Sequence, residues 1–205
     1  MKKELVVSFE PNYNLDYDRR ELRDKIFRIS FKVLLWIIVL GAAIFAAWAI
    51  TTYCIEKTNM TGNSMEPALA DGDKVLVNRL SYRSDDPDRF DVIVFVISGK
   101  EHDYYGIRRV IGLPGEKVQI KDGCVYINDE LLEEQNAVEP MQVYGLAEDP
   151  VYLDDDEFFV LGDNRNDCID SRYTGMGNVS RDSIIGKAWI RLDGLAVISG
   201  LNKKE

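Results

Sequence analysis

The feature that most constrains this chain is an uncharged stretch at residues 33–55, which reads VLLWIIVLGAAIFAAWAITTYCI. Its first 18 residues are all apolar or glycine. At a rise of about 1.5 Å per residue, a helix of this length reaches about 34 Å, enough to cross a hydrocarbon core of about 30 Å. A helix also satisfies its own backbone polar groups, which lipid cannot do. The sequence therefore predicts a transmembrane helix over residues 33–55.

Basic residues precede this span and indicate its orientation. Residues 1–32 contain eight Lys or Arg, six of them in the second half, whereas only Lys57 follows the span closely. Because basic residues accumulate on the cytoplasmic side, we expect a cytoplasmic basic tail at residues 1–32 and an extracytoplasmic domain at residues 56–205, in a single-pass protein of the cell membrane. The alternative is a cleaved signal peptide, since Ala47-Trp48-Ala49 fits an A-x-A site. The long charged leader and the length of the span favour the uncleaved anchor.

Charge and composition exclude several functional classes. The whole chain has a net charge of −10, and the residues after position 32 carry 17 basic against 29 acidic side chains. Nucleic acid is therefore not expected as a partner, because phosphate binding needs clustered cations. The three cysteines form no CxxC pair and there is a single histidine, so neither a disulfide framework nor a zinc-type site is expected. We expect no metal and no cofactor.

The residues after the span predict a mostly antiparallel β domain. Short runs rich in β-branched and aromatic residues alternate there with turn residues, and no βαβ rhythm or repeat is present. Strands are expected at residues 74–78, 91–97, 107–111, 158–161, 187–192 and 195–198. A hairpin is expected over residues 118–128, where Asp122-Gly123 supplies a positive-φ turn. Residues 129–157, which are rich in acids and contain two prolines, are expected to form an irregular insertion.

A serine shortly after the span is a candidate nucleophile. Residues 61–69 read TGNSMEPAL, with Ser64 at the centre. Taken alone, a serine in such a sequence is usually a turn residue. Gly62, however, lets a backbone approach closely, and Pro67 stiffens the turn behind the serine. A serine hydroxyl also needs a neighbouring base and donors for an oxyanion.

Two later segments have the composition of a site. Residues 108–116 read RRVIGLPGE and leave a predicted strand through a Gly-Pro-Gly turn, and residues 162–172 read GDNRNDCIDSR. The second segment alone fits a solvated acidic turn. Asp and Arg at this density also fit a paired, hydrogen-bonded network beneath an active site.

Taken together, these three motifs resemble type I signal peptidase. They read G-x-S-M-x-P, R-V-I-G-L-P-G-E and G-D-N-R-x-x-x-x-D-S-R, they occur in this order behind an N-terminal anchor, and the resemblance extends to about residue 190. It implies two antiparallel β sheets, a serine–lysine dyad, and removal of signal peptides from exported proteins after small residues. The implied partners are signal-peptide-bearing preproteins and the lipid membrane.

The resemblance also assigns roles to residues of this chain. Ser64 would be the nucleophile, and its main-chain amide would supply much of the oxyanion hole. The oxyanion and substrate loop would comprise Gly62, Asn63, Met65 and Pro67. The supporting network would comprise Asp163, Asn164, Arg165, Cys168, Asp170, Ser171 and Arg172.

The chain departs from the family at the position of the base. Arg108 stands where active bacterial members have lysine, and Cys168 stands where they have a serine that orients that lysine. Arginine side chains stay protonated far above pH 7, so a neutral arginine at pH 7 costs about 9 kcal/mol. This is comparable to a whole catalytic barrier reduction of about 8–23 kcal/mol. Arg108 is therefore not a credible general base.

Several interpretations follow from this departure. Lys100 or His102 could fold back on Ser64, although polar neighbours make both typical of an exposed turn. Ser64 could work slowly with water or a carboxylate, without the ~10²–10⁴-fold that a positioned base provides. The domain could instead be a catalytically silent homologue that binds exported surface proteins or assists their assembly, or a generic anchored β module with Ser64 as a turn residue. A binding-only protein has no chemical need for the nucleophile, so retention of Ser64 favours residual or rewired activity.

Overall fold

The computed structural model describes residues 13–97, 104–134, 139–194 and 196–198. The chain divides into two compact units, Met1–Ala49 and Ile50–Glu205, which are considered separately. Lys100 and His102, which the sequence offered as alternative bases, lie outside the described residues. The predicted fold class is confirmed, because an N-terminal apolar helix precedes a domain of antiparallel sheets.

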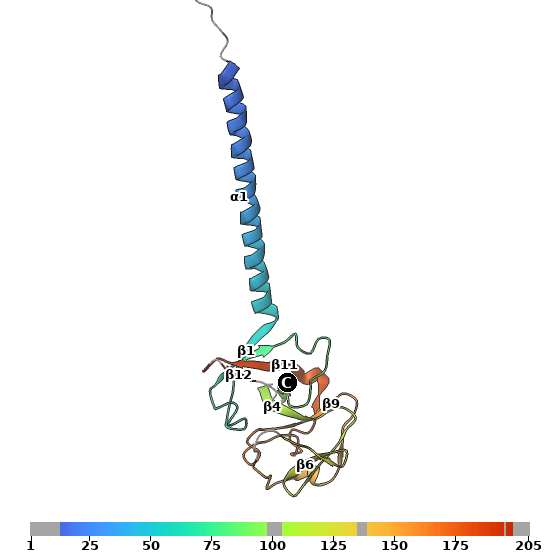
Figure 1. The fold of residues 1–205 in the computed structure, drawn as a ribbon. Coiled ribbons are helices and arrows are strands. Elements are labelled where there is room, and N and C mark those ends of the chain that lie inside the picture. Colours follow the sequence, from blue (N-terminus) through green and yellow to red (C-terminus); the bar gives the residue numbers. More distant parts are fainter. Residues whose placement is uncertain (1–12, 98–103, 135–138, 195, 199–205) are drawn as a thin grey trace, which may run out of the picture. The chain divides into compact units, whose positions relative to one another are not determined.

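The first unit is formed by the helix α1, Tyr13–Tyr53 (Figure 1). Its described side chains are almost all exposed, and Arg19–Ile50 is the described helical segment long and apolar enough to cross a membrane. The helix begins well before the predicted span at residue 33. The charged segment is itself helical because it is rich in good helix formers, and Glu21 and Lys25 form an ion pair one turn apart at 2.9 Å. The helix ends at Tyr53, and Ile55, predicted as its last residue, belongs to a strand.

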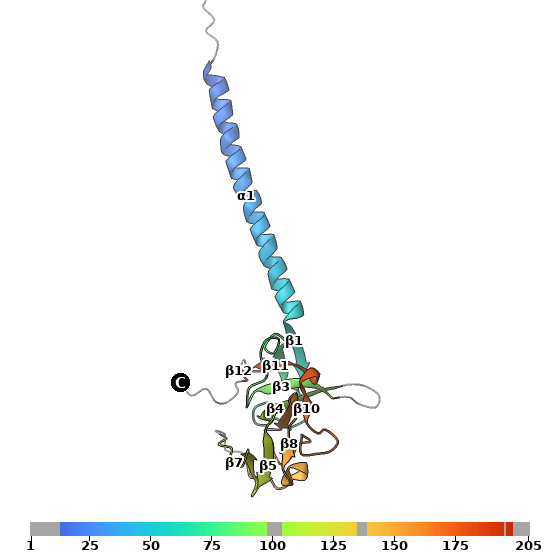
Figure 2. The same ribbon diagram turned by 90° about the vertical axis from the view of Figure 1, so that its right-hand side faces the viewer.

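The second unit contains a large sheet in which all pairings are antiparallel (Figures 1 and 2). Its strands are, in spatial order, β1 (Ile55–Asn59), β2 (Lys74–Asn78), β11 (Ile184–Arg191), β3 (Val92–Ile97), β4 (Tyr104–Gly112), β9 (Glu157–Leu161) and β10 (Val179–Ser180), and β12 (Ala196–Val197) pairs with β11. The C-terminal strand β11 therefore separates β2 from β3, which are neighbours in the sequence.

A smaller antiparallel sheet follows β4 along the chain, around β6 in Figure 1. Its spatial order is β7 (Glu130–Leu131), β6 (Cys124–Ile127), β5 (Lys117–Lys121) and β8 (Val151–Tyr152). Asp122 and Gly123 have φ angles of 50° and 77° between β5 and β6, as a tight hairpin turn requires. The expected irregular insertion at residues 129–157 contains β7, β8 and the 3-10 helix η1 (Gly145–Glu148), and β9 begins at its last residue.

Both faces of β3 pack against the core of the second unit. Val92 and Val94 point into one buried cluster, whereas Ile93 and Phe95 point into another. This explains why the strand is a continuous apolar run and not an alternating one. The first cluster also contains Met65 and Leu69, which are both fully buried. The core therefore holds the loop that carries Ser64.

Candidate active site

The serine loop is fixed on both sides of Ser64. Met65 and Leu69 anchor it in the core, and the Leu69 amide donates to the Met65 carbonyl at 2.9 Å. On the other side, Gly62 adopts a φ of +78°, which favours glycine, and its amide donates to Asp71 Oδ1 at 2.7 Å. Pro67 is exposed in the turn after Ser64, in the same loop. Asp71 was not predicted as a site residue, although the adjacent Asp71-Gly72-Asp73 turn is a visible signal.

Ser64 itself is buried, with 9% of its surface exposed. Among the residues that the structure describes, no hydrogen bond is made by its hydroxyl or by its main-chain amide. An unengaged hydroxyl beside an unengaged amide is the arrangement that a nucleophile and an oxyanion donor require.

The loop at residues 162–172 lies directly against the serine loop. The Asn164 amide donates to the Ser64 carbonyl at 3.1 Å, and Asn164 Nδ2 donates to the Asn63 carbonyl at 3.3 Å. An added Cβ at Gly162 would lie 2.5 Å from the Ser64 carbonyl oxygen and 2.3 Å from Cys168 Sγ. Those two atoms are therefore at most 4.8 Å apart. Two motifs a hundred residues apart in the sequence thus meet at Ser64.

Arg108 reaches the same loop from β4, but it does so as a donor. Its Nε and Nη2 donate to the Ile169 carbonyl at 3.1 and 2.8 Å, and its Nη1 donates to the Ile107 carbonyl at 2.6 Å. The Cys168 thiol donates to the same Ile169 carbonyl at 3.4 Å. Arg108 and Cys168 are therefore brought together, as predicted from the motifs. The motifs also predict that Ser64 lies within about 4 Å of an atom of Arg108 or Cys168, and this stays a prediction.

Cys168 is held as a neutral thiol. Burial raises the pKa of this thiol to about 12, although the positive charge of Arg108 opposes the rise. A protonated thiol is a poor nucleophile and accepts a proton no more readily than water does. Cys168 is consequently not a candidate general base.

Beneath the site, Asp170 and Arg172 form a fully buried ion pair. Arg172 Nε and Nη2 donate to the two Asp170 oxygens at 2.8 and 2.9 Å, and their side chains are 1% and 0% exposed. Asp170 also accepts from the Gly162 amide at 3.3 Å. Ser171 accepts from the Val160 amide through its hydroxyl at 3.0 Å, which ties the loop to β9. The pair thus fixes both ends of the loop that carries Cys168.

Two of the other three charged residues of this loop, Asp163 and Arg165, form ion pairs with residues outside it. Asp163 receives two hydrogen bonds from Arg109 of β4, at 2.7 and 2.6 Å. Arg165 donates to both oxygens of Glu134, at 3.0 and 2.5 Å. Arg109 and Glu134 were not assigned to the site from the sequence. Arg109 lies within a recognised motif, whereas nothing in the sequence around Glu134 distinguishes it from the other acids of its segment.

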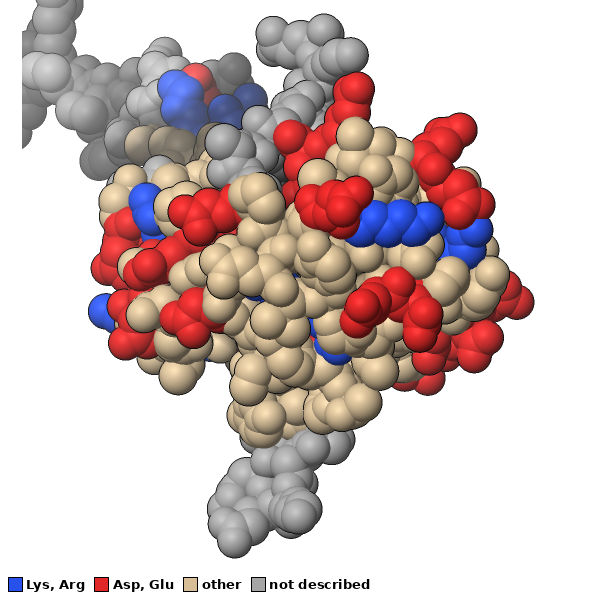
Figure 3. Space-filling model, turned by 90° about the horizontal axis from the view of Figure 1, so that it is seen from below, with Lys and Arg blue, Asp and Glu red and all other residues tan. Residues whose placement is uncertain are grey.

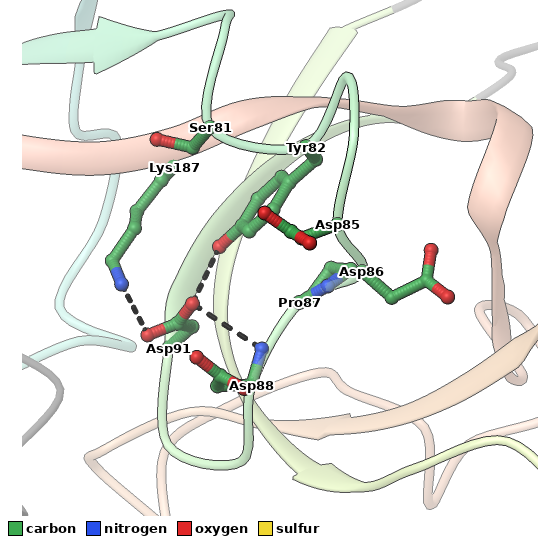
Figure 4. Close-up of a pocket in the computed structure, with 8 residues that line it drawn as sticks. All are labelled: Ser81, Tyr82, Asp85, Asp86, Pro87, Asp88, Asp91 and Lys187. Carbon is green, nitrogen blue, oxygen red and sulfur yellow. Dashed lines mark hydrogen bonds and ion pairs between the residues drawn. The ribbon is translucent and has the colours of Figure 1, made fainter.

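A polar cavity of about 510 Å³ is lined by a different set of residues, Ser81, Tyr82, Asp85, Asp86, Pro87, Asp88, Asp91 and Lys187 (Figure 4). The buried Asp91 accepts from Tyr82 at 2.9 Å and pairs with Lys187 at 2.5 Å. The cavity includes none of the predicted site residues, and its lysine is held in an ion pair. Among the described residues, no group of three His, Cys, Asp or Glu could hold a metal ion.

Comparison with known proteins agrees with the motifs. A family model described as signal peptidase, peptidase S26, matches residues 33–192. A probable signal peptidase I-2 from Synechocystis is 39% identical over 155 residues, which cover 73% of this chain and 68% of the relative. A signal peptidase I from Leptolyngbya laminosa is 37% identical, covering 74% of this chain and 75% of the relative. Signal peptidase I P from Bacillus subtilis subsp. natto is 31% identical, covering 80% and 90%.

A crystal structure of a signal peptidase I from Enterococcus faecalis is 30% identical, covers 50% of this chain and 97% of its own, and superposes with a TM-score of 0.39. The family match spans more than half of the chain, and the Synechocystis relative is well aligned over most of both proteins. The resemblance seen in the three motifs is therefore confirmed, and this chain belongs to the signal peptidase family, peptidase S26.

Proposed function

We propose that this chain is a membrane-bound serine endopeptidase that removes signal peptides from exported proteins, with Ser64 as its nucleophile and without the usual lysine base. The observation that carries the proposal is Ser64 itself. Ser64 is buried, and Met65 and Asn164 hold its loop in place. Its hydroxyl and its main-chain amide make no hydrogen bond among the described residues. Membership of the signal peptidase family supports the substrate class.

In this mechanism, the Ser64 hydroxyl attacks the scissile carbonyl and the Ser64 amide stabilises the oxyanion. The serine proton leaves to water, because neither Arg108 nor the neutral Cys168 accepts it. The C–N bond then breaks, and the amine of the mature protein leaves with a proton from water. A second water hydrolyses the Ser64 ester, which frees the serine and releases the signal peptide with a new C-terminal carboxylate. Asp163, Asp170 and their arginine partners hold the loop at residues 162–172 against the serine loop. The reaction therefore proceeds, but without the ~10²–10⁴-fold that a positioned base contributes.

A second candidate is favoured by Arg108. Three hydrogen bonds to main-chain carbonyls fix its guanidinium, and the motif resemblance assigns Arg108 to the place of the family's lysine. A site in which the base is replaced by a fixed cation suits a silent homologue that binds exported surface proteins or assists their assembly. Retention of Ser64 favours the peptidase.

Cleavage of a preprotein by the full chain in detergent micelles distinguishes the two candidates. Wild type is expected to release the mature protein slowly, and Ser64→Ala is expected to release none. Cys124→Ser, which changes an exposed thiol of the small sheet, serves as the matched control and should cut like wild type. If wild type and Ser64→Ala are equally inactive while both retain a preprotein in pull-down, the binding homologue is the better account.

We also propose that α1 anchors the protein in the cell membrane, with residues 1–32 in the cytoplasm and residues 56–205 outside. The long apolar segment Arg19–Ile50 and the basic residues before position 33 support this topology. Protease added to intact cells should digest the β domain and spare the N-terminal tail. Protection of the β domain would exclude this orientation, and with it access to exported preproteins.

A further inference from the structure

The arginines of the second unit are nearly all paired with carboxylates, and Arg108 is the exception among those that are at least partly buried. Arg89, Arg109, Arg165 and Arg172 each form an ion pair at 2.5–2.8 Å. Within the described part of the chain, Arg108 has no carboxylate partner. Its hydrogen bonds go only to the carbonyls of Ile107 and Ile169. A half-buried cation without a counterion attracts an anion more strongly than an exposed one does.

Arg108 retains N–H donors for such an anion. A guanidinium has five N–H donors, and three of them are used by the two carbonyls. Two donors remain for a ligand, the number that a bidentate carboxylate requires. Because the carbonyls already hold the side chain in place, little rotamer entropy is lost when a ligand binds.

The position of Arg108 connects this anion site to the nucleophile. Its Nη2 and the Cys168 sulfur lie 2.8 and 3.4 Å from the same Ile169 oxygen, and that sulfur lies within 4.8 Å of the Ser64 carbonyl oxygen. The Cys168 thiol is neutral, so it does not supply the missing negative charge. A peptide bond cut at Ser64 leaves a new carboxylate on the N-terminal product.

We infer that Arg108 forms a carboxylate-binding subsite beside Ser64, and that its ligand is the free C-terminal carboxylate of a peptide, as on a cleaved signal peptide. This inference rests on the proposed function, since it takes peptides of that class to be the ligands of the site. The charge of the chain does not favour anions in general. The residues after position 32 carry 29 acids against 17 bases, and Figure 3 shows acidic side chains on both sides of a mainly uncharged central area. Retention of a carboxylate must therefore come from a local cation.

The test compares two labelled peptides that end in Ala-x-Ala, one with a free carboxylate and one with a C-terminal amide. Their affinities for the full chain in detergent micelles are measured by fluorescence anisotropy. Wild type should bind the acid about tenfold more tightly than the amide, the factor that corresponds to about 1.4 kcal/mol. In Arg108→Gln this ratio should fall to about one. Arg83→Gln, which removes an exposed positive charge from the same domain, should keep the wild-type ratio.

The near-UV circular dichroism of Arg108→Gln checks its fold. If that fold is lost, Arg108→Lys replaces it and should show a ratio of about three, because lysine keeps the charge without the fork of donors. Equal affinities of wild type for acid and amide would overturn the subsite while leaving peptides as ligands, and so would an unchanged ratio in Arg108→Gln. Absence of binding by both peptides, together with no Ser64-dependent cleavage, would overturn the subsite and the proposed function together.

Discussion

Breaking the buried pair of Asp170 and Arg172 should cost a large share of the stability of the β domain. Their side chains are 0% and 1% exposed, and Asp170 accepts hydrogen bonds from Arg172 Nε, Nη2 and the Arg172 amide at 2.8, 2.9 and 3.2 Å. Replacing Asp170 by Asn keeps the shape but leaves the guanidinium buried without a counterion. Loss of one partner from a buried pair costs about 3–5 kcal/mol. Total stabilities are about 5–15 kcal/mol, so this is a substantial fraction.

The assay is urea and thermal unfolding of the full chain in detergent, followed by near-UV circular dichroism. A loss of about 3–5 kcal/mol should lower the melting temperature by roughly 6–20 °C for a domain of this size. The matched control is Asp86→Asn, which breaks a pair with Arg181 in which the Asp86 side chain is 70% exposed. That change should cost less than about 1 kcal/mol. A cost for Asp170→Asn no larger than for the control would refute the reasoning that the network beneath the site is a buried, coupled support.

Two further predictions concern the loop beside Ser64. Gly162→Ala should remove most of the activity and lower the melting temperature, because the added Cβ would lie 2.3 Å from Cys168 Sγ and 2.5 Å from the Ser64 carbonyl oxygen. A Gly162→Ala variant that unfolds and cleaves like wild type would contradict this close approach. At pH 9, an alkylating reagent should modify the exposed Cys124 and spare Cys168, as judged by peptide mass spectrometry, because burial raises the pKa of the Cys168 thiol to about 12. Because the pKa of this thiol is higher in the folded than in the unfolded protein, its contribution to the free energy of unfolding is complete below about pH 9 and is lost as pH rises towards 12. Cys168→Ser should remove this loss of stability at high pH.

Local patterns in the sequence were sufficient for most strands. The range 74–78 matches β2 residue for residue, and the range 91–97 differs from β3 by one residue. The hairpin at Asp122-Gly123 was correct because a positive-φ turn is a chemical requirement that few residue pairs meet. By contrast β1 (Ile55–Asn59) was missed, because its first residue completes the apolar span and the remaining residues, EKTN, are polar. The placement of β11 between β2 and β3 has no local signal, since it joins segments about a hundred residues apart.

The site shows the same division between local and long-range information. The motifs predicted that the loop at residues 162–172 is charged and paired, and four of its five charged residues, Asp163, Arg165, Asp170 and Arg172, have an ion-pair partner in the structure. They did not predict that Glu134 would be the partner of Arg165, because a contact across 31 residues depends on how the small sheet folds back. The hydrogen bonds that fix Arg108 could not be predicted from the sequence either, because every residue has a main-chain carbonyl and the residue type does not indicate which one accepts.

The most direct test of the account is the effect of introducing lysine at position 108 on the rate of preprotein cleavage. Initial rates of wild type, Arg108→Lys and Arg108→Lys with Cys168→Ser are compared in the same micelles, with Ser64→Ala as the blank. A base positioned beside Ser64 should raise the rate by about 10²-fold or more, and the hydroxyl at position 168 should raise it further, because a hydroxyl is a better hydrogen-bond partner for an amine than a thiol. A wild-type rate equal to or above that of both lysine variants would contradict the claim that a fixed guanidinium has replaced the base.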